Sequence, residues 1–97
     1  MTVPERMRQA AMYDDLGKME RLLLHTLACT WQGDEEWNFV AWSDLVDYSG
    51  MSVHALRAAA NTLRELGYVD FEGKQGRKQK MLSLGPALQV QRRPRAA

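Results

Sequence analysis

Residues 50–69 read GMSVHALRAAANTLRELGYV and predict the best-defined helix of this chain. Ser52 is a preferred N-cap residue, because its hydroxyl can accept a hydrogen bond from an unpaired main-chain N–H, and it places the helix at residues 53–66. Apolar residues recur there at helical spacing: Leu56, Ala59, Ala60, Leu63 and Leu66. Gly50 and Gly67 flank the helix, and glycine readily takes the left-handed conformation in which helices end. The pattern predicts a helix with one buried face, preceded by a tight glycine turn.

Two further helices are expected near the N-terminus. Thr2 and Glu5 match a capping box, with Pro4 in the first turn, and predict a short helix that Gly17 separates from the next segment. The following stretch carries a wide apolar stripe at helical spacing, made of Leu16, Met19, Leu22, Leu23, Leu24, Leu27 and Ala28. This stripe predicts a well-buried helix of three to four turns.

A loop, a strand and a brief helix fill the chain between this stripe and Gly50. The acidic run 34–36 follows Gly33 and is typical of a solvated surface loop. Residues 37–40, Trp-Asn-Phe-Val, alternate large apolar residues with smaller ones and predict a short strand. Ser43 predicts the N-cap of a brief helix that ends at Gly50.

A β-hairpin is expected after Gly67. Residues 68–72 and 80–84 both alternate with period two, and Gly73 and Gly76 between them favour a turn with a basic tip. Gly85-Pro86 stops the second strand. The predicted fold class is therefore mainly α with a small β-hairpin, an α+β fold in a single domain at residues 16–86. Residues 1–15 are expected to form a helical extension and residues 87–97 a flexible basic tail.

Length and composition restrict the class of protein. The chain has 97 residues, of which 45% are hydrophobic and 26% charged, which is ordinary globular composition. A chain of this size has little surface left for a deep substrate cleft, which excludes large multi-step enzymes. Cys29 has no partner for an intramolecular disulfide, and no apolar run approaches the roughly 18 residues of a membrane span. The expected setting is soluble, reducing and cytoplasmic, without a membrane partner.

The two halves of the chain carry opposite charges. Residues 1–51 have four Lys or Arg and nine Asp or Glu, which gives a formal charge of −5. Residues 52–97 have nine basic and three acidic residues, which gives +6, and no acid follows Glu72. This asymmetry indicates a C-terminal half that faces a polyanion, with a solvated tail as the alternative.

The order of elements and several residues resemble the winged helix-turn-helix domain of MarR-type regulators and of phage and plasmid replication proteins. Residues 50–52 resemble the family's Gly-hydrophobe-Ser turn, residues 66–69 its exit from the recognition helix, and residues 82–84 the strand that returns from the wing. The resemblance covers roughly residues 16–86. MarR-type wings often carry Asp-x-Arg, whereas this chain has Gln75 and Arg77, and it lacks the family's C-terminal dimerisation helices. Phage replication domains are therefore the closer analogy.

This resemblance implies a protein that reads duplex DNA as a transcriptional or replication regulator. With the apolar face buried, helical geometry turns His54, Arg57 and Asn61 outward together, and these side chains can bond to base edges. The recognition helix of this family enters the major groove by its N-terminal half. The expected DNA-binding residues are Ser52, Val53, His54, Arg57, Ala58 and Asn61 in the helix and Lys74, Arg77, Lys78 and Lys80 in the wing. The wing residues are suited to phosphate contacts, and Arg92, Arg93 and Arg95 could extend them.

Other functions have weaker support in the sequence. Trp31, Trp37, Phe39 and Trp42 could stack on single-stranded bases, but core packing is the favoured interpretation, with one tryptophan left exposed at an interface. His25 and Cys29 could form half of a zinc site, yet no CxxC or HExxH pattern accompanies them. No catalytic constellation and no cofactor motif is found, so an enzyme is not expected.

A protein-binding role is the alternative to DNA binding. Winged helices also bind proteins, and the acidic N-terminal half offers a surface for a partner, as in a small phage-type inhibitor of the anti-CRISPR kind. The loop at residues 34–36 would then be required for activity. A homodimer is a further alternative, because the face of residues 16–27 and the segment around Met7, Ala11 and Met12 could pair two copies or close the core of one.

Overall fold

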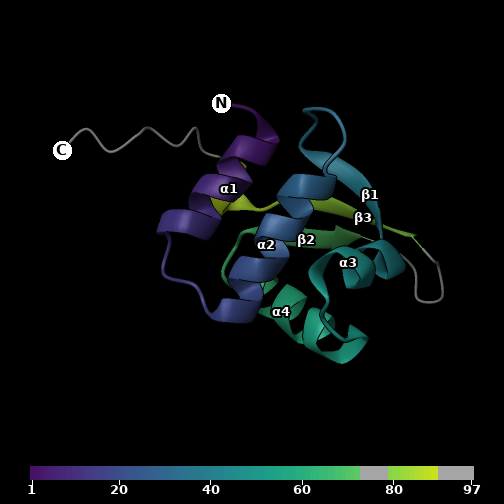
Figure 1. Cartoon of the computed structure of the whole chain (residues 1–97). Helices are drawn as coiled ribbons and strands as arrows, with labels where there is room; N and C mark the ends of the chain where they lie inside the picture. Colours follow the sequence, from purple (N-terminus) through teal and green to yellow (C-terminus); the bar gives the residue numbers. More distant parts are fainter. Residues whose placement is uncertain (73–78, 90–97) are drawn as a thin grey trace.

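A computed structural model describes residues 1–72 and 79–89, and Figure 1 shows the arrangement of its elements. The order along the chain is α1 (Val3–Tyr13), α2 (Lys18–Thr30), β1 (Trp37–Ala41), α3 (Trp42–Ser49), α4 (Val53–Glu65), β2 (Val69–Glu72), β3 (Gln79–Leu84) and α5 (Pro86–Gln89). The protein is mostly helical with one small antiparallel sheet. This architecture confirms the expected α+β class.

A local capping residue sets the start of α1 but not that of α3. The Oγ1 of Thr2 accepts a hydrogen bond from the main-chain N–H of Glu5 at 3.2 Å and caps α1, as predicted. Ser43, in contrast, is not the N-cap of α3, and that prediction is wrong. The N-cap is Ala41, because β1 remains paired with β3 up to Ala41 and the chain enters the helix directly at Trp42. Ser43 therefore lies inside the first turn.

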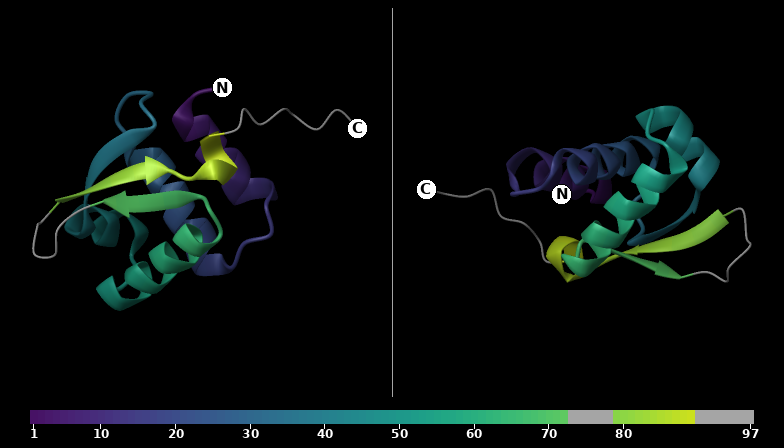
Figure 2. Two further views of the ribbon diagram at one scale, coloured as in Figure 1. Left: turned by 180° about the vertical axis from the view of Figure 1, so that it is seen from behind. Right: turned by 90° about the horizontal axis from the view of Figure 1, so that it is seen from below.

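The sheet has the strand order β1-β3-β2, so that β3 lies between two antiparallel neighbours. The predicted hairpin corresponds to β2 and β3, which pair from Val69↔Leu84 onward. The predicted strand at residues 37–40 is β1, which joins the far side of β3 in the register Trp37↔Ser83. The helices gather on one face of this sheet, and no described helix lies over the strands when the molecule is seen from behind (Figure 2, left).

Helix α2 lies at the centre of the core. Leu23, Leu24 and Leu27 are fully buried, and the helix packs against α1, α3 and α4. Two members of the predicted stripe, Met19 and Leu22, are exposed among the described residues. Helix α1 closes the core from one side, because its apolar residues are buried in the same cluster: Val3, Met7, Ala10 and Ala11. Met7 and Ala11 of the N-terminal segment thus pack within one molecule, whereas Met12 is exposed.

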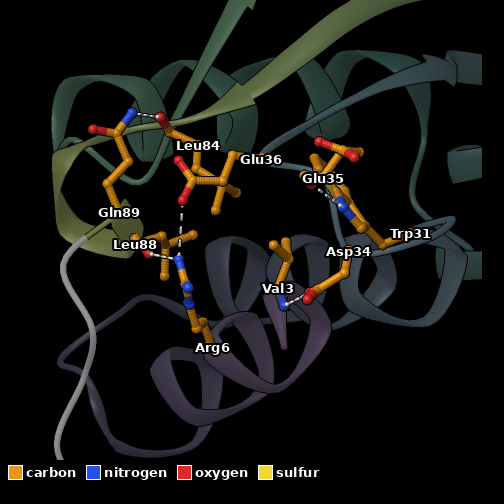
Figure 3. A network of polar contacts seen from close by, with 9 residues as sticks. All are labelled: Val3, Arg6, Trp31, Asp34, Glu35, Glu36, Leu84, Leu88 and Gln89. Atoms are coloured by element: carbon orange, nitrogen blue, oxygen red, sulfur yellow. Dashed lines mark hydrogen bonds and ion pairs between the residues drawn. The ribbon is translucent and has the colours of Figure 1, made fainter. Parts of the chain in front are cut away.

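Contacts from the acidic loop before β1 hold α1 in place (Figure 3). The Oδ1 of Asp34 accepts a hydrogen bond from the main-chain N–H of Val3 at 2.6 Å. The guanidinium of Arg6 lies 3.4 Å from Glu36 Oε1 and donates to the main-chain oxygen of Leu88 at 3.2 Å. The loop is exposed, as predicted, but two of its three acids also bind α1, a role that the sequence pattern did not indicate.

Helix α5 was not predicted. Residues 87–89 were expected to begin a flexible tail, and instead they complete a single helical turn in which Leu88 is fully buried. The Nε2 of Gln89 donates to the main-chain oxygen of Leu84 at 2.7 Å, which ties this turn to the end of β3. Residues 90–97, the rest of the predicted tail, lie outside the described residues.

The β2–β3 pairing continues past the two strands, and there Gly85 passes close to Gly67 and Tyr68. The main-chain N–H of Gly85 donates to the oxygen of Tyr68 at 2.8 Å, and that of Ala87 donates to the oxygen of Gly67 at 2.9 Å. A Cβ at position 85 would overlap the carbonyl oxygen of Gly67, which belongs to the main chain and cannot rotate aside. Gly85 is therefore required for the close approach of the two segments.

We expect Gly85→Ala to lower the free energy of unfolding by about 2–3 kcal/mol, because the added Cβ forces two main-chain segments apart. Gly17→Ala is the matched control, since a Cβ there meets only the flexible end of the Glu20 side chain. Its cost should stay within about 1 kcal/mol, the difference between glycine and alanine at a helix N-cap. Urea unfolding followed by circular dichroism measures the free energy of unfolding of both variants. Equal losses would contradict the close approach of Gly85 to Gly67.

Candidate nucleic-acid interface

A three-residue turn sets the start of α4. Gly50 adopts the left-handed conformation with φ 73°, and its N–H donates to the main-chain oxygen of Val46 at 2.9 Å, which ends α3. The side chain of Met51 is buried in the core. The Oγ of Ser52 then accepts a hydrogen bond from the N–H of Ala55 at 3.1 Å and caps α4. The predicted glycine turn and serine cap are both confirmed.

One face of α4 is anchored in the core. Leu56 and Leu63 are fully buried, and Ala59 and Ala60 between them are almost so. The small side chains of the two alanines allow a close approach, and the helix packs against α2 and β2. This anchoring matches the predicted apolar spacing, except for Leu66. Leu66 is the C-cap residue and is half exposed.

The opposite face of α4 presents an exposed set of side chains. His54, Arg57, Ala58 and Asn61 are all exposed, as is Val53 at the start of the helix. In the part of the chain that the structure describes, the side chains of His54, Arg57 and Asn61 make no hydrogen bond or ion pair. These three residues lie at spacings i, i+3 and i+7, and their polar groups are therefore free to bond to a ligand along one side of the helix.

The predicted basic tip falls mostly outside the described residues. Lys74, Arg77 and Lys78 lie in the segment 73–78, which the structure does not describe, and so do Arg92, Arg93 and Arg95 in the segment 90–97. Lys80 lies in β3, in register opposite Val40 of β1. The described part of the predicted wing is the strand pair β2 and β3, which lie before and after residues 73–78 in the chain (Figure 1).

The charges beside α4 are mixed. Arg64, near the C-terminal end of the helix, lies 3.4 Å from Asp70 of β2, and both side chains are more than half exposed. An exposed pair of this kind contributes little to stability. On α3, Asp44 and Asp47 are exposed, and this helix has no Lys or Arg. Arg57 is consequently the one cation of α4 without an ion-pair partner among the described residues.

The four central aromatic residues do not share one environment. Trp31 is buried, and its Nε1 donates to the main-chain oxygen of Glu35 at 2.9 Å. Trp42 is partly buried against the core and lies 5.7 Å from the ring of Phe71. The core prediction is wrong for Phe39, which is 58% exposed, whereas Trp37, at 48%, is an exposed tryptophan of the kind that was expected. They lie at i and i+2 on a strand with solvent on that side, and alternation alone cannot say which face is covered.

His25 and Cys29, the candidate half of a zinc site, both lie on α2. They lie on its exposed side, and the described ranges 1–72 and 79–89 contain no group of three His, Cys, Asp or Glu that could hold a metal ion. No helix within these ranges is long and apolar enough to cross a membrane.

Comparisons with protein-family models, with curated proteins and with solved structures gave no match for this chain. Its functional interpretation therefore rests on the residues themselves.

We expect Ser52→Ala to lower the free energy of unfolding by about 1 kcal/mol, because it leaves the N–H of Ala55 without its cap. Ser43→Ala is the matched control, since Ser43 is exposed and does not cap α3, and its effect should stay within about 0.5 kcal/mol. Thermal unfolding without nucleic acid compares the two. A larger loss for Ser43→Ala would show that α3 begins at Ser43 after all.

Proposed function

We propose that this chain is a winged helix-turn-helix module that binds duplex DNA and acts as a regulator of transcription or replication. In this proposal α3 and α4 are the two helices of the motif, α4 enters the major groove, and the β2–β3 connection is the wing. The basic residues 74–80 then follow the phosphate backbone.

The observation that carries the proposal is the exposed face of α4. Arginine can bond bidentately to guanine and asparagine to adenine, while histidine can reach a base edge or a phosphate. Arg57, Asn61 and His54 supply these groups from one side of a helix whose other side is rigidly packed. Ala58 leaves room for close approach, and the exposed Val53 at the N-terminal end can contact a thymine methyl group.

The arrangement of the other elements supports the same proposal. The order α2-β1-α3-α4-β2-β3 follows the resemblance noted in the sequence, and the turn at residues 50–52 joins α3 to α4 as that motif requires. The C-terminal half of the chain carries a formal charge of +6, and most of its Lys and Arg residues lie in the sequence segments 74–80 and 92–95. Basic segments of this kind attract a polyanion at low salt.

DNA binding should depend steeply on salt. Neutralising about four to six phosphates gives a log–log slope near −4 to −5, so affinity for a random-sequence duplex should fall by about 10²–10³-fold between roughly 50 and 200 mM salt. Fluorescence anisotropy of a labelled duplex measures this. Absence of binding at the lower salt concentration would refute the proposed function.

Arg57→Ala and Lys78→Ala should weaken binding in different ways. Loss of a base contact should relax sequence preference at one position and cost about 1–3 kcal/mol, whereas loss of a phosphate contact should weaken all sequences alike. Arg64→Ala is the matched control, because Arg64 lies on the same helix but is paired with Asp70. Selection from a random duplex pool, followed by titration, compares the three. An unchanged preference in Arg57→Ala would contradict the orientation of α4.

A further inference from the structure

The free edge of the sheet presents a second surface, unrelated to α4. Among the described strands, β1 ends the order β1-β3-β2 and has a single neighbour, β3. The N–H of Leu84 donates to the main-chain oxygen of Glu36 at 2.9 Å. This bond shows which residues of β1 have their main-chain groups directed at β3. Main-chain groups alternate along an antiparallel pair, so those of Asn38 and Val40 face β3. Those of Trp37 and Phe39 point away from the sheet, where another strand can pair with them.

An exposed aromatic pair lies along this edge. The rings of Trp37 and Phe39 are edge to face, with centroids 5.9 Å apart and an interplanar angle of 81°. Together with Met81 and Ser83 of β3 they line a shallow hollow of about 440 Å³. No described helix covers this face of the sheet (Figure 2, left). Large apolar side chains left open in this way are typical of an interaction surface.

A groove of about 460 Å³ runs along β1 on the side of the sheet where the helices lie. It is bounded by this strand, the end of α2 and the start of α3. The charged residues that line it are both acids, Glu35 and Asp44. Among the described residues, their carboxylates have no hydrogen-bond or ion-pair partner, in contrast to those of Asp34 and Glu36, which bind α1 (Figure 3). The groove is therefore complementary to a cation.

We propose that the β1 edge, made of Trp37, Phe39, Glu35 and Asp44, binds an extended basic segment of a partner protein. The segment adds a fourth strand beside β1 and pairs with the outward main-chain groups of Trp37 and Phe39. Because side chains alternate along a strand, its apolar residues meet the aromatic pair while its Lys or Arg residues reach the acidic groove. This site goes beyond DNA binding and does not depend on it.

The acidic residues of this edge disfavour two other occupants, a second copy of the chain and nucleic acid. Pairing of β1 with β1 of a second copy would bring Glu35 and Asp44 of both molecules to one edge, and like charges placed together are unfavourable. Nucleic acid would set its phosphates beside the same two carboxylates. A basic peptide strand satisfies both the open main chain and the unpaired acids.

The first test uses the full-length protein and a fluorescein-labelled eight-residue peptide that alternates arginine with valine, read by anisotropy. Two control peptides carry glutamate in place of arginine, or methylated main-chain nitrogens along one edge. We expect the parent peptide to bind at least about tenfold more tightly than either control, which corresponds to about 1.4 kcal/mol. Equal binding of the methylated peptide would overturn strand pairing, and equal binding of the acidic peptide would overturn the charge complementarity.

Variants of the protein test the same site with the peptide kept unchanged. The N–H of Phe39 points outward, so Phe39→Pro removes one donor from the open edge and leaves the pairing with β3 intact. We expect Phe39→Pro to bind the peptide at least about tenfold more weakly than Phe39→Ala, which removes the aromatic ring alone. If Phe39→Pro fails to fold by circular dichroism, the methylated peptide on the unmodified protein remains the decisive measurement.

Charge reversal gives a matched pair of variants. Glu35→Lys should lose about tenfold in peptide affinity, because Glu35 lines the groove and its main-chain contact to Trp31 is retained. Asp15→Lys, an exposed acid outside the groove, should stay within about twofold. Arg57→Ala should leave peptide binding unchanged, so that failure of this site and failure of the DNA proposal are distinguishable.

Two results would assign the edge to another occupant and overturn the proposal. Sedimentation that shows a dimer, lost in Phe39→Pro but not in Phe39→Ala, would assign the edge to a second copy. A gain in peptide affinity on deletion of residues 90–97 would assign it to the chain's own basic C-terminal segment.

Discussion

The close main-chain approach of Gly85 to Gly67 joins the end of α4, the base of the β2–β3 pair and α5. Two hydrogen bonds, Gly85 to Tyr68 and Ala87 to Gly67, hold the segments at a distance that leaves no room for a Cβ at Gly85. Gly67 has φ 83°, a conformation that lets the chain leave the helix directly for β2. The orientation of α4 relative to the sheet follows from this constraint, and so does the burial of Leu88.

The fold presents two separate surfaces, the outward face of α4 and the β1 edge. The outward face of α4 is polar and belongs to the basic half of the sequence, whereas the β1 edge is aromatic and acidic. Helix α3 connects them, because it begins directly at the end of β1 and ends at Gly50, immediately before the turn into α4. A chain of 97 residues can thus offer one surface to a polyanion and another to a basic partner.

The predictions that succeeded rest on short-range physics. Thr2 and Ser52 each cap a main-chain N–H three residues further on, and Gly50 takes the conformation that only glycine adopts readily, so neighbouring residues suffice to predict them. Ser43 offered the same signal and failed, because the end of β1 is set by its pairing with β3. For the candidate DNA interface, the sequence identified the exposed face of α4. The predicted wing residues Lys74, Arg77 and Lys78 lie outside the described residues.

By itself the sequence determined the presence and order of the four longer helices, the glycine turn before α4, the hairpin and the uneven distribution of charge. These features depend on periodicity, capping and turn residues, which act within a few positions. Only the tertiary structure decided that β1 pairs with β3, that Trp31 is buried while Trp37 and Phe39 are open, and that residues 86–89 form a helix. Such outcomes depend on contacts between residues far apart in the chain, whose geometry no local pattern contains.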